Sequence, residues 1–433
     1  MLKRKILQKL HKWHDSDQKK APLLYGARQV GKTTAVREFA RECYPHFVEV
    51  NFVRTPSVMR AFDGDLSTTT ILTNLSAMGL GPFIKHETLV FFDEIQECPN
   101  ARTALKFLVE EHYCDYIASG SLLGINYKPV TSYPVGFEER YDVYPMDFEE
   151  FLWAKGVSDE VIEVLRKSLL SLTPVPSFIH EQMSRFYREY LVVGGMPEVV
   201  QQYVSDPNFS EVERLQQAIL STYRADITHY AGHQAPLVKR VFDALPSQLG
   251  KQDKRFILAS LEKGASNRKY MDPTQWLIDA GIAYYSFNIG SFERPFEAYE
   301  NRRLYKLYMV DTGLLCSQLL TNMQFEVMNG DIGINEGALT ENFVACTLAA
   351  NNHSLHYYDK KSRLELDFVL QERDGIAIVE VKSGDDYTRH ASLNHAMNDY
   401  GNLISRSIVL SKNNIAFRNG ILYIPLYMAG IIF

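Results

Sequence analysis

The chain has 433 residues, 46% hydrophobic and 23% charged, which is the balance of a folded globular protein and excludes a disordered or fibrous one. The length predicts roughly two to four domains, because domains commonly span about 100–200 residues. Lys and Arg number 46 against 52 Asp and Glu, and the net charge of -6 excludes a uniformly basic nucleic-acid coat protein but not a local basic face.

The cellular setting and the first helix follow from simple patterns. No run reaches the roughly 18 apolar residues that a membrane span needs, so we expect no membrane partner. The five cysteines include no CxxC pair, which indicates reduced thiols in a cytoplasmic protein rather than a disulfide frame or a zinc site. Leu2, Ile6, Leu10 and Trp13 lie at helical spacing and predict an amphipathic first helix.

A phosphate-binding loop is predicted after the first apolar run. Residues 21–25 fit a short strand, residues 34–43 fit a helix, and GARQVGKTT between them has the GxxxxGKT spacing. The glycines let backbone N–H groups turn toward phosphate oxygens, and the following helix adds its positive end. Lys32 is expected to reach the β- and γ-phosphates of ATP, and the Thr33 hydroxyl to ligate Mg²⁺. The predicted nucleotide-binding residues of this loop are Gly26, Ala27, Arg28, Gln29, Val30, Gly31, Lys32, Thr33 and Thr34.

An acidic pair follows the next buried strand. Residues 88–92 form a continuous apolar run typical of a parallel strand, and the run ends in Asp93 and Glu94. Acids at the C-terminal end of such a strand lie where ligands bind in open α/β sheets. We expect Asp93 to hold Mg²⁺, directly or through water, and Glu94 to orient and activate the attacking water as a catalytic residue.

Two more strand ends are expected at the same site. Tyr113–Ala118 leads to Ser119, a candidate contact for the γ-phosphate or the water, although an ordinary turn of Ser and Gly explains the segment equally well. Asn51 ends the predicted strand Glu49–Phe52. Walker A, Walker B and a sensor-like strand end thus occur in order within about 120 residues. In these motifs the sequence resembles the AAA+-type P-loop ATPases.

Two later segments extend the resemblance. Residues 136–152 resemble the PLSF-E-F segment of a large family of prokaryotic ATPases that pair an AAA-type domain with a C-terminal domain of unknown function. Residues 193–200 carry the GG-x-P of that family, and the signal-transducing STAND ATPases have a similar G-x-P near the nucleotide base or sugar. The resemblance implies that Gly195 and Pro197 sense the nucleotide. The local pattern indicates a helix break with Pro197 starting the next helix, and both readings can hold.

Helical patterns over Ser158–Ser171, Ile179–Val192 and Glu211–Tyr230 predict a lid of helices over the ATP cleft. Arg140 and Arg224 are candidates for stabilising charge during hydrolysis, and an ordinary salt bridge is the alternative for each. An arginine supplied by another subunit would be compatible with a ring or dimer, so an oligomer is possible but not required.

A locally basic segment follows. Residues 236–310 contain 12 Lys and Arg against 8 Asp and Glu, a local net charge of +4. Helices at Leu237–Leu245, Phe256–Lys263 and Pro273–Ala280, then two strand-like runs at Ile282–Phe287 and Lys306–Val310, suggest a winged helix. Residues 266–269 are expected at or beside a recognition helix, where they would contact DNA. A winged helix that only packs against the ATPase is the equally weighted alternative.

The C-terminal stretch predicts a second site. Its order is a helix from Gly337, strands at residues 356–359, 365–370 and 376–383, a helix at Ala391–Tyr400 and a strand at Ser407–Leu410. Glu380 and Lys382 are two residues apart on the third strand and therefore face one side. Asp367 from the neighbouring strand and Glu341 from the helix are expected to converge with Glu380 on Mg²⁺. Lys382 is then placed to position a water and offset charge during attack on a phosphodiester.

These residues resemble the restriction-endonuclease-like PD-(D/E)xK fold. The C-terminal domain of the ATPase family likewise carries E-N-F, E-x-D-F and E-V-K segments. The matching positions here are Glu341, Glu365, Asp367, Glu380 and Lys382. The dipeptide PD is absent, because Leu366 precedes Asp367. A salt-bridged strand face on an inactive relative of the fold is the alternative.

The predicted fold class is therefore α/β: a P-loop AAA+-type parallel sheet with a helical lid, a winged-helix module and a C-terminal restriction-endonuclease-like α/β domain. The expected domains are 1–155 for the ATPase core, 156–235 for the lid, 236–320 for the winged helix and 321–433 for the nuclease-like domain. The leading hypothesis is an ATPase whose nucleotide state controls a nucleic-acid-handling module. The second is a STAND-like, ATP-dependent signalling switch that acts through protein contacts with a C-terminal domain that does not cut. A metabolic kinase is weaker, because no acceptor-pocket motif follows Walker B.

Overall fold

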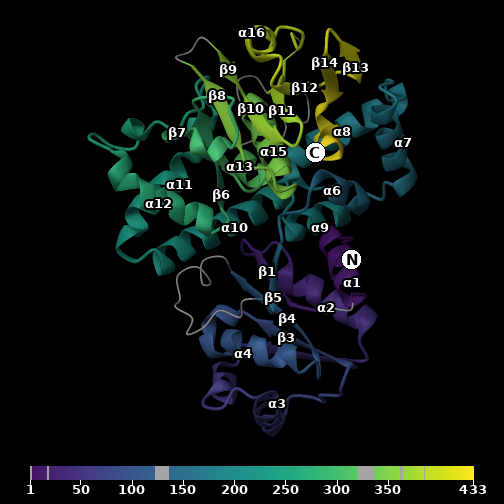
Figure 1. Ribbon diagram of the computed structural model, residues 1–433, viewed down its shortest axis with the longest axis vertical. Coiled ribbons are helices and arrows are strands. Elements are labelled where there is room, and N and C mark those ends of the chain that lie inside the picture. Colours follow the sequence, from purple (N-terminus) through teal and green to yellow (C-terminus); the bar gives the residue numbers. More distant parts are fainter. Residues whose placement is uncertain (1, 17–18, 122–135, 320–335, 361–363, 385) are drawn as a thin grey trace. The chain divides into compact units, whose positions relative to one another are not determined.

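The computed structural model describes residues 2–16, 19–121, 136–319, 336–360, 364–384 and 386–433 (Figure 1). The chain divides into two compact units, built mainly from Lys3–Tyr144 and from Pro145–Ile278 with Ile282–Phe433. None of the helices in these described ranges is long and apolar enough to traverse a lipid bilayer.

The first unit is organised around a parallel five-stranded sheet. Its strand order is β2-β3-β4-β1-β5, and every neighbouring pair is parallel. All six residues of β1 and of β3 are buried, as expected for apolar runs inside a covered sheet. Because the strands are parallel, the carboxyl ends of β1, β3 and β4 lie at one edge. The strands are β1 (Ala21–Gly26), β2 (His46–Asn51), β3 (Thr88–Asp93), β4 (Asp115–Ser121) and β5 (Glu138–Asp142).

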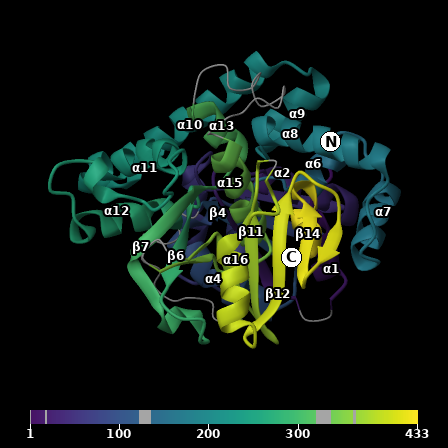
Figure 2. The same ribbon diagram turned by 90° about the horizontal axis from the view of Figure 1, so that it is seen from above.

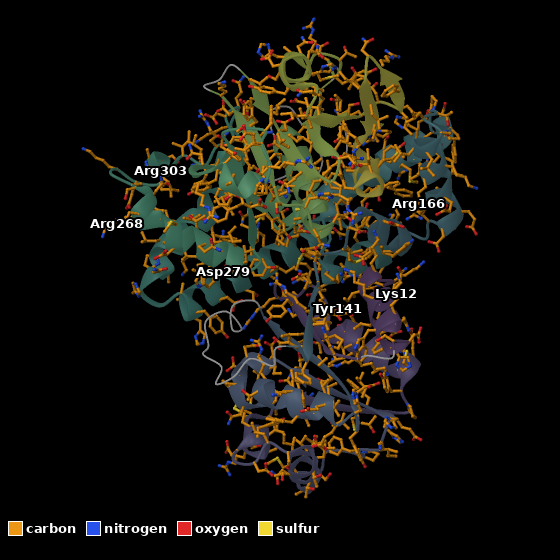
Figure 3. The ribbon with its side chains drawn as sticks, viewed as in Figure 1. Lys12, Tyr141, Arg166, Arg268, Asp279 and Arg303 are labelled. Atoms are coloured by element: carbon orange, nitrogen blue, oxygen red, sulfur yellow. The ribbon has the colours of Figure 1, made fainter. Side chains whose placement is uncertain are left out.

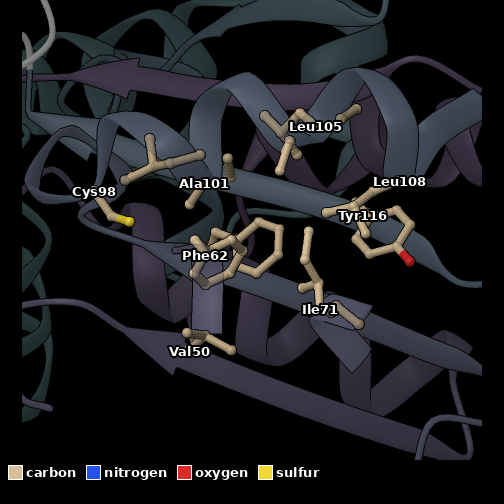
Figure 4. Close-up of a cluster of buried hydrophobic side chains, with 14 of the residues drawn as sticks. Val50, Phe62, Ile71, Cys98, Ala101, Leu105, Leu108 and Tyr116 are labelled. Atoms are coloured by element: carbon tan, nitrogen blue, oxygen red, sulfur yellow. The ribbon is translucent and has the colours of Figure 1, made fainter. Parts of the chain in front are cut away.

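Helices complete the core of this unit. The predicted amphipathic first helix is present as α1, and Ile6, Leu10 and Trp13 on it are buried. A large apolar cluster lies between the sheet and the helices, where Phe62, Ile71 and Leu105 are fully buried (Figure 4). This packing fixes the strand ends that carry the polar residues. The helices are α1 (Lys5–His14), α2 (Lys32–Cys43), α3 (Thr68–Ala77) and α4 (Pro99–Glu110), with 3-10 turns η1 (Pro56–Phe62) and η2 (Ile95–Glu97).

The second unit begins with helices. The three predicted helical stretches after residue 156 are observed as α7, α8 and α10, with ends that differ by at most two residues. The helices are α6 (Phe148–Ala154), α7 (Asp159–Leu170), α8 (Ser177–Val193), α9 (Pro197–Ser205), α10 (Phe209–Tyr230), α11 (Ala235–Leu249), α12 (Asn267–Asp279) and α13 (Thr312–Leu319), with the 3-10 turn η3 (Gly232–Gln234).

One predicted helix is wrong. Phe256–Lys263 forms only a 3-10 turn, η4 (Leu258–Ser260). The Phe256 N–H donates to the carbonyl oxygen of Tyr305 at 2.8 Å, and the two rings stack with centroids 5.8 Å apart. Bonding to a distant strand thus replaces the local helical hydrogen bonds that the sequence pattern favoured.

A four-stranded sheet joins the basic segment to the C-terminal stretch. Its order is β7-β6-β8-β9, with an antiparallel β6–β7 hairpin and a parallel β6–β8 pair. The expected wing hairpin therefore shares a sheet with strands that follow residue 321, so a continuous sheet crosses that expected domain boundary. The strands are β6 (Ala283–Ile289), β7 (Glu300–Met309), β8 (His356–Asp359) and β9 (Glu365–Leu366), with the 3-10 turn η5 (Phe296–Ala298) between β6 and β7.

The last sheet carries the second candidate site. Its order is β10-β11-β12-β14-β13, and helices α15 and α16 contact β11 and β12 (Figures 1 and 2). The expected single strand at residues 365–370 is divided at Asp367, which lies between β9 and β10 in different sheets. The elements are α15 (Glu336–Ala350), β10 (Phe368–Glu372), β11 (Gly375–Val381), α16 (Ala391–Tyr400), β12 (Ile404–Ser411), β13 (Ala416–Arg418), β14 (Ile421–Pro425), η7 (Leu426–Met428) and α17 (Ala429–Ile432).

Candidate functional site

The predicted phosphate-binding loop lies between β1 and α2. Gln29 and Gly31 have φ of 66° and 91°, so the loop turns through left-handed conformations before the helix begins at Lys32. Gly26 is closely packed, because a Cβ there would lie 2.2 Å from the carbonyl oxygen of Val143. The remaining predicted loop residues lie in the same turn and first helical residues: Ala27, Arg28, Val30, Thr33 and Thr34.

Lys32 is folded back onto this loop. Its Nζ donates to the carbonyl oxygens of Gly26 and Ala27 at 2.9 and 2.8 Å. Burial lowers the pKa of Lys32 to about 8, with the nearby carboxylates of Glu94 and Asp93 opposing the shift. A buried ammonium whose hydrogen bonds, among the described residues, go to carbonyl oxygens is well placed to gain from an anionic ligand.

Arg4 is a loop contact that the sequence pattern did not reveal. Its guanidinium donates to the carbonyl oxygens of Val30 at 2.9 Å and Tyr144 at 2.8 Å. The arginine is buried, so one side chain from before α1 ties the loop to Tyr144, two residues after β5. Its position between Lys3 and Lys5 gave no local signal of this contact.

Asp93 is the centre of a polar cluster at the sheet edge. Thr33 Oγ1 lies 3.2 Å from each of its oxygens, Ser119 Oγ donates to Oδ1 at 2.5 Å, and Asn51 Nδ2 donates to Oδ2 at 2.8 Å. Burial raises the pKa of Asp93, partly offset by the Ser119 hydrogen bond. The structure thus brings together four residues from α2, β2, β3 and β4. A carboxylate and a hydroxyl at this place are the hard oxygen donors that Mg²⁺ prefers, so the residues fit that ion.

Glu94 follows Asp93 in an unusual conformation. Its φ of 57° and ψ of 46° place a non-glycine residue in the left-handed region, where it begins the 3-10 turn η2. Gln96 Nε2 donates to Glu94 Oε2 at 2.5 Å. The glutamate is therefore held beside the Asp93 cluster by a residue two positions later.

Gly195 and Pro197 lie in the second unit. The Gly195 N–H donates to Asp311 Oδ2 at 2.6 Å, and the Met146 N–H donates to the Gly195 carbonyl oxygen at 2.6 Å. A Cβ on Gly195 would lie 2.0 Å from the Met146 carbonyl oxygen. Pro197 is the first residue of α9. Close packing against the Met146 backbone is therefore enough to require glycine at position 195.

The two candidate arginines each have an acidic partner. Arg140 lies 2.7 Å from Asp142 and over the ring of Tyr25, in the first unit. Arg224 lies 2.9 Å from Asp243, in the second unit. Both contacts match the salt-bridge alternative.

The second candidate site separates into two groups. In the first, Glu380 Oε2 lies 3.1 Å from Lys382 Nζ, and Asp367 Oδ2 accepts the N–H of Val381 at 2.9 Å. Burial, with the charge of Asp367, raises the pKa of Glu380 to about 8. Its Oε1 is buried and has no hydrogen-bond partner among the described residues.

The second group consists of Glu341 and two lysines. Lys306 Nζ lies 3.2 Å from Glu341 and 3.5 Å from Glu365, Lys254 binds the other Glu341 oxygen, and Tyr308 donates to Glu341 at 2.5 Å. Burial opposes the charge of Glu341, but Lys254 and Lys306 outweigh it and lower the pKa of Glu341 to about 2. The carboxylate is therefore already neutralised by protein groups.

The expected convergence of three carboxylates is not observed. Across the ranges that the structure describes, no three His, Cys, Asp or Glu side chains are grouped so as to share a metal ion. Glu341 is instead paired with Lys306, which is fully buried. A lone lysine within the apolar run at residues 304–310 was the available sequence signal for this pairing. Asp367 and Glu380 remain the oxygen donors that fit Mg²⁺, which commonly uses one or two carboxylates and retains water.

The basic segment is partly neutralised by its own surroundings. Arg268, at the start of α12, and Arg303, on β7, are exposed at the edge of the second unit (Figure 3). Counting only carboxylates of the described residues, six of the 12 basic residues have a partner within 4.0 Å: Arg240, Lys254, Arg255, Lys269, Arg302 and Lys306.

Comparisons with known proteins agree with the first site. Residues 18–152 match the family model described as AAA domain. Residues 184–324 and 336–428 match models described as Domain of unknown function (DUF8612) and Domain of unknown function (DUF4143). The chain has no significant match among curated proteins.

The solved structures that are similar include the following three. The Walker-type ATPase PABY2304 of Pyrococcus abyssi is 14% identical, with 74% of this chain and 96% of that chain covered and a TM-score of 0.43. The Aeropyrum pernix ORC1 protein in complex with DNA is 12% identical, with 74% and 92% covered and a TM-score of 0.30. A Thermotoga maritima RuvB variant is 15% identical, with 65% and 89% covered and a TM-score of 0.29. The AAA match covers most of the first unit and, with the P-loop, supports a P-loop AAA-type ATPase.

Proposed function

We propose that the protein binds ATP with Mg²⁺, hydrolyses it, and uses its nucleotide state to control a nucleic-acid-handling second unit. The cluster of Thr33, Asp93 and Ser119 at the carboxyl edge of the sheet, with Glu94 beside it, is the observation that supports hydrolysis best. Such strand ends are where ligands bind in open α/β sheets.

Each residue has a distinct role in this proposal. Backbone N–H groups of residues 26–34 bind the phosphates, and Lys32 exchanges its two loop carbonyl partners for β- and γ-phosphate oxygens. Thr33 and Asp93 hold Mg²⁺, which supplies charge neutralisation on the phosphates. Glu94 accepts a proton from the attacking water, and Ser119 contacts the γ-phosphate or that water.

Turnover of Lys32→Ala tests this assignment. We expect ATP hydrolysis to be lost, because the variant lacks the ammonium that binds the transferring phosphate. The matched control is Lys9→Ala, which removes an exposed lysine from α1. Hydrolysis by Lys32→Ala at the wild-type rate would refute the P-loop assignment.

Control of the second unit is proposed from chain continuity and charge. β5 ends at Asp142, and the second unit begins three residues later at Pro145. The N–H of the next residue, Met146, donates to the carbonyl oxygen of Gly195. Movement of β5 on hydrolysis would therefore act on the start of the second unit. Exposed Arg268 and Arg303 supply a surface for phosphate contacts with DNA.

Binding of labelled duplex DNA, measured at two salt concentrations with and without ATP, tests this control. ATP-linked binding that weakens with salt is expected, because phosphate contacts release counterions. Absence of such binding would favour the signalling switch. The same assay with Arg268→Gln and Arg303→Gln tests whether these two arginines contact the DNA, in which case both variants bind it more weakly than the wild type.

For the second site we propose that Asp367 and Glu380 hold Mg²⁺ and that Lys382 positions a water for attack on a phosphodiester. The buried and unpartnered Oε1 of Glu380 supports this, because such an oxygen gains a partner when it binds a cation. A cleavage screen with Mg²⁺ or Mn²⁺ on varied nucleic acids, with Lys382→Ala as control, is the test. Equal cleavage by the variant would indicate contamination.

The second candidate function is the STAND-like switch with a C-terminal domain that does not cut. One observation favours it: Glu341, an expected metal ligand, is neutralised by Lys254 and Lys306. A domain stabilised by such pairs needs no metal ion. Slow ATP turnover without cleavage of any nucleic acid in the screen would support this function.

A further inference from the structure

Gln96 lies where it can act on the candidate base of the first site. It occupies the 3-10 turn η2 two residues after Glu94, and Ile95 between them is fully buried in the apolar core of the first unit. Anchoring of Ile95 holds the turn in place, so Glu94 and Gln96 emerge from a fixed backbone.

The turn combines an unusual backbone conformation with a short side-chain hydrogen bond. Glu94 has a left-handed backbone with φ of 57°, which costs free energy for a residue that carries a side chain. The Nε2 of Gln96 donates to Glu94 Oε2 at 2.5 Å. The unusual backbone is therefore accompanied by a hydrogen bond that fixes the direction of the carboxylate.

The second polar atom of the Gln96 amide, Oε1, differs from Nε2 in its surroundings. Only 6% of Gln96 is exposed, and its Oε1 has no hydrogen-bond partner among the described residues. A buried amide oxygen without a partner is unfavourable and is uncommon outside functional sites. A donor that is bound during function would satisfy it.

We propose that Gln96 is a positioning residue for ATP hydrolysis, with Nε2 holding Glu94 Oε2 and Oε1 accepting a hydrogen bond from the attacking water. This inference rests on the proposed function. Glu94 Oε1 then takes the proton of the same water. The water oxygen forms a bond to the γ-phosphorus as the bond from that phosphorus to the bridging oxygen breaks, and ADP leaves with the electron pair.

The test uses Gln96→Met, because methionine keeps the length and packing of glutamine but removes its hydrogen bonds. We expect kcat to fall about tenfold or more, a part of the 10²–10⁴-fold that a positioned base contributes. The affinity for a fluorescent ATP analogue is expected to be unchanged. A loss in kcat without a loss in nucleotide affinity is the pattern of a residue that acts only during hydrolysis.

Gln96→Glu adds a second measurement, since it keeps an acceptor oxygen but replaces the donor with a like charge beside Glu94. It is expected to lower kcat at least as far as Gln96→Met does, because repulsion between the two carboxylates displaces Glu94. The matched control is Asn100→Leu, which removes a nearby amide that donates to the Phe62 carbonyl oxygen at 3.2 Å. This control is expected to leave kcat unchanged.

Glu94→Gln separates the two levels of the argument. If Glu94→Gln turns over like wild type, the assignment of the base fails. If Glu94→Gln is inactive while Gln96→Met keeps the wild-type kcat, only the role of Gln96 is refuted. A fall in the kcat of Gln96→Met together with weaker binding of the ATP analogue and lower stability would also refute it, since that pattern indicates a merely structural residue.

Discussion

The turn at Gly194 and Gly195 offers the sharpest test of how the second unit is held together. Gly195 contacts backbone on one side and Asp311 on the other, and an alanine Cβ would lie 2.0 Å from the Met146 carbonyl oxygen and 2.8 Å from the Met146 nitrogen. Both contacts are to main chain, which cannot rotate away as a side chain can. Gly195→Ala therefore forces the start of the second unit to move.

The loss in the free energy of unfolding caused by Gly195→Ala can be worked out from these contacts. Overpacking of this kind costs about 1–3 kcal/mol. Loss of the 2.6 Å hydrogen bond from the Gly195 N–H to Asp311 adds about 1.5–3 kcal/mol, because the acceptor is a carboxylate. We expect the free energy of unfolding of the second unit to fall by about 3–5 kcal/mol, a large share of the 5–15 kcal/mol typical of a folded domain.

A matched glycine distinguishes sterics from backbone conformation. Gly156 has φ of 80°, and no atom lies within 4 Å of the position of its missing Cβ. Gly156→Ala is expected to cost only about 1–2 kcal/mol, the penalty of a left-handed residue with a side chain. Comparison of the two variants isolates the contribution of the crowded turn.

Hydrogen exchange in increasing urea, read by mass spectrometry, measures the two units separately. Peptides covering 145–152 report the second unit, and peptides covering 88–97 report the first. The reasoning is refuted if Gly195→Ala changes protection at 145–152 by less than about 0.5 kcal/mol, the usual range of a neutral surface substitution. Weaker ATP binding without loss of stability would instead favour nucleotide sensing by this segment.

The remaining predictions concern the second site. Lys306→Met leaves Glu341 buried with one fewer cation, so urea unfolding is expected to show a loss of about 3–5 kcal/mol. Lys254 and Lys306 lower the pKa of Glu341 to about 2, so the stability that this carboxylate contributes is present above its unfolded pKa and is lost as the pH falls toward 2. The free energy of unfolding should therefore fall more steeply over this pH range for the wild type than for Lys306→Met. The pKa of Glu380 is raised to about 8, so stability falls as pH rises from its unfolded value toward 8. Glu380→Gln should remove that fall, and equal slopes for variant and wild type between pH 5 and 8 would contradict it.

Residues whose roles depend on neighbours in sequence were accessible to prediction. The P-loop spacing identified the turn before α2, and the apolar run before Asp93 identified a buried strand with an acid at its end. Strand ends collect at one edge whenever the strands are parallel, so the meeting of Asp93 with Ser119 and Asn51 followed from their positions. Local pattern sufficed because each feature is encoded within a few residues.

Residues whose roles depend on distant segments were not accessible. Arg4, Lys254 and Lys306 each act through contacts with segments far away in the sequence, which no local period reports. The expected helix at Phe256–Lys263 failed for the same reason, since Phe256 bonds to β7. Glu341 matched a metal-ligand pattern, yet the fold supplied it with lysines.

The sequence by itself determined the nucleotide-binding turn, the buried strands and the order of the elements, because apolar periodicity and glycine spacing act over short range. Only the tertiary structure decided which charges meet. Burial of an ion requires a partner, and the partner of Glu341 comes from β7, 35 positions earlier in the chain. The free energy that pairs such residues is available only once the sheets have formed around them.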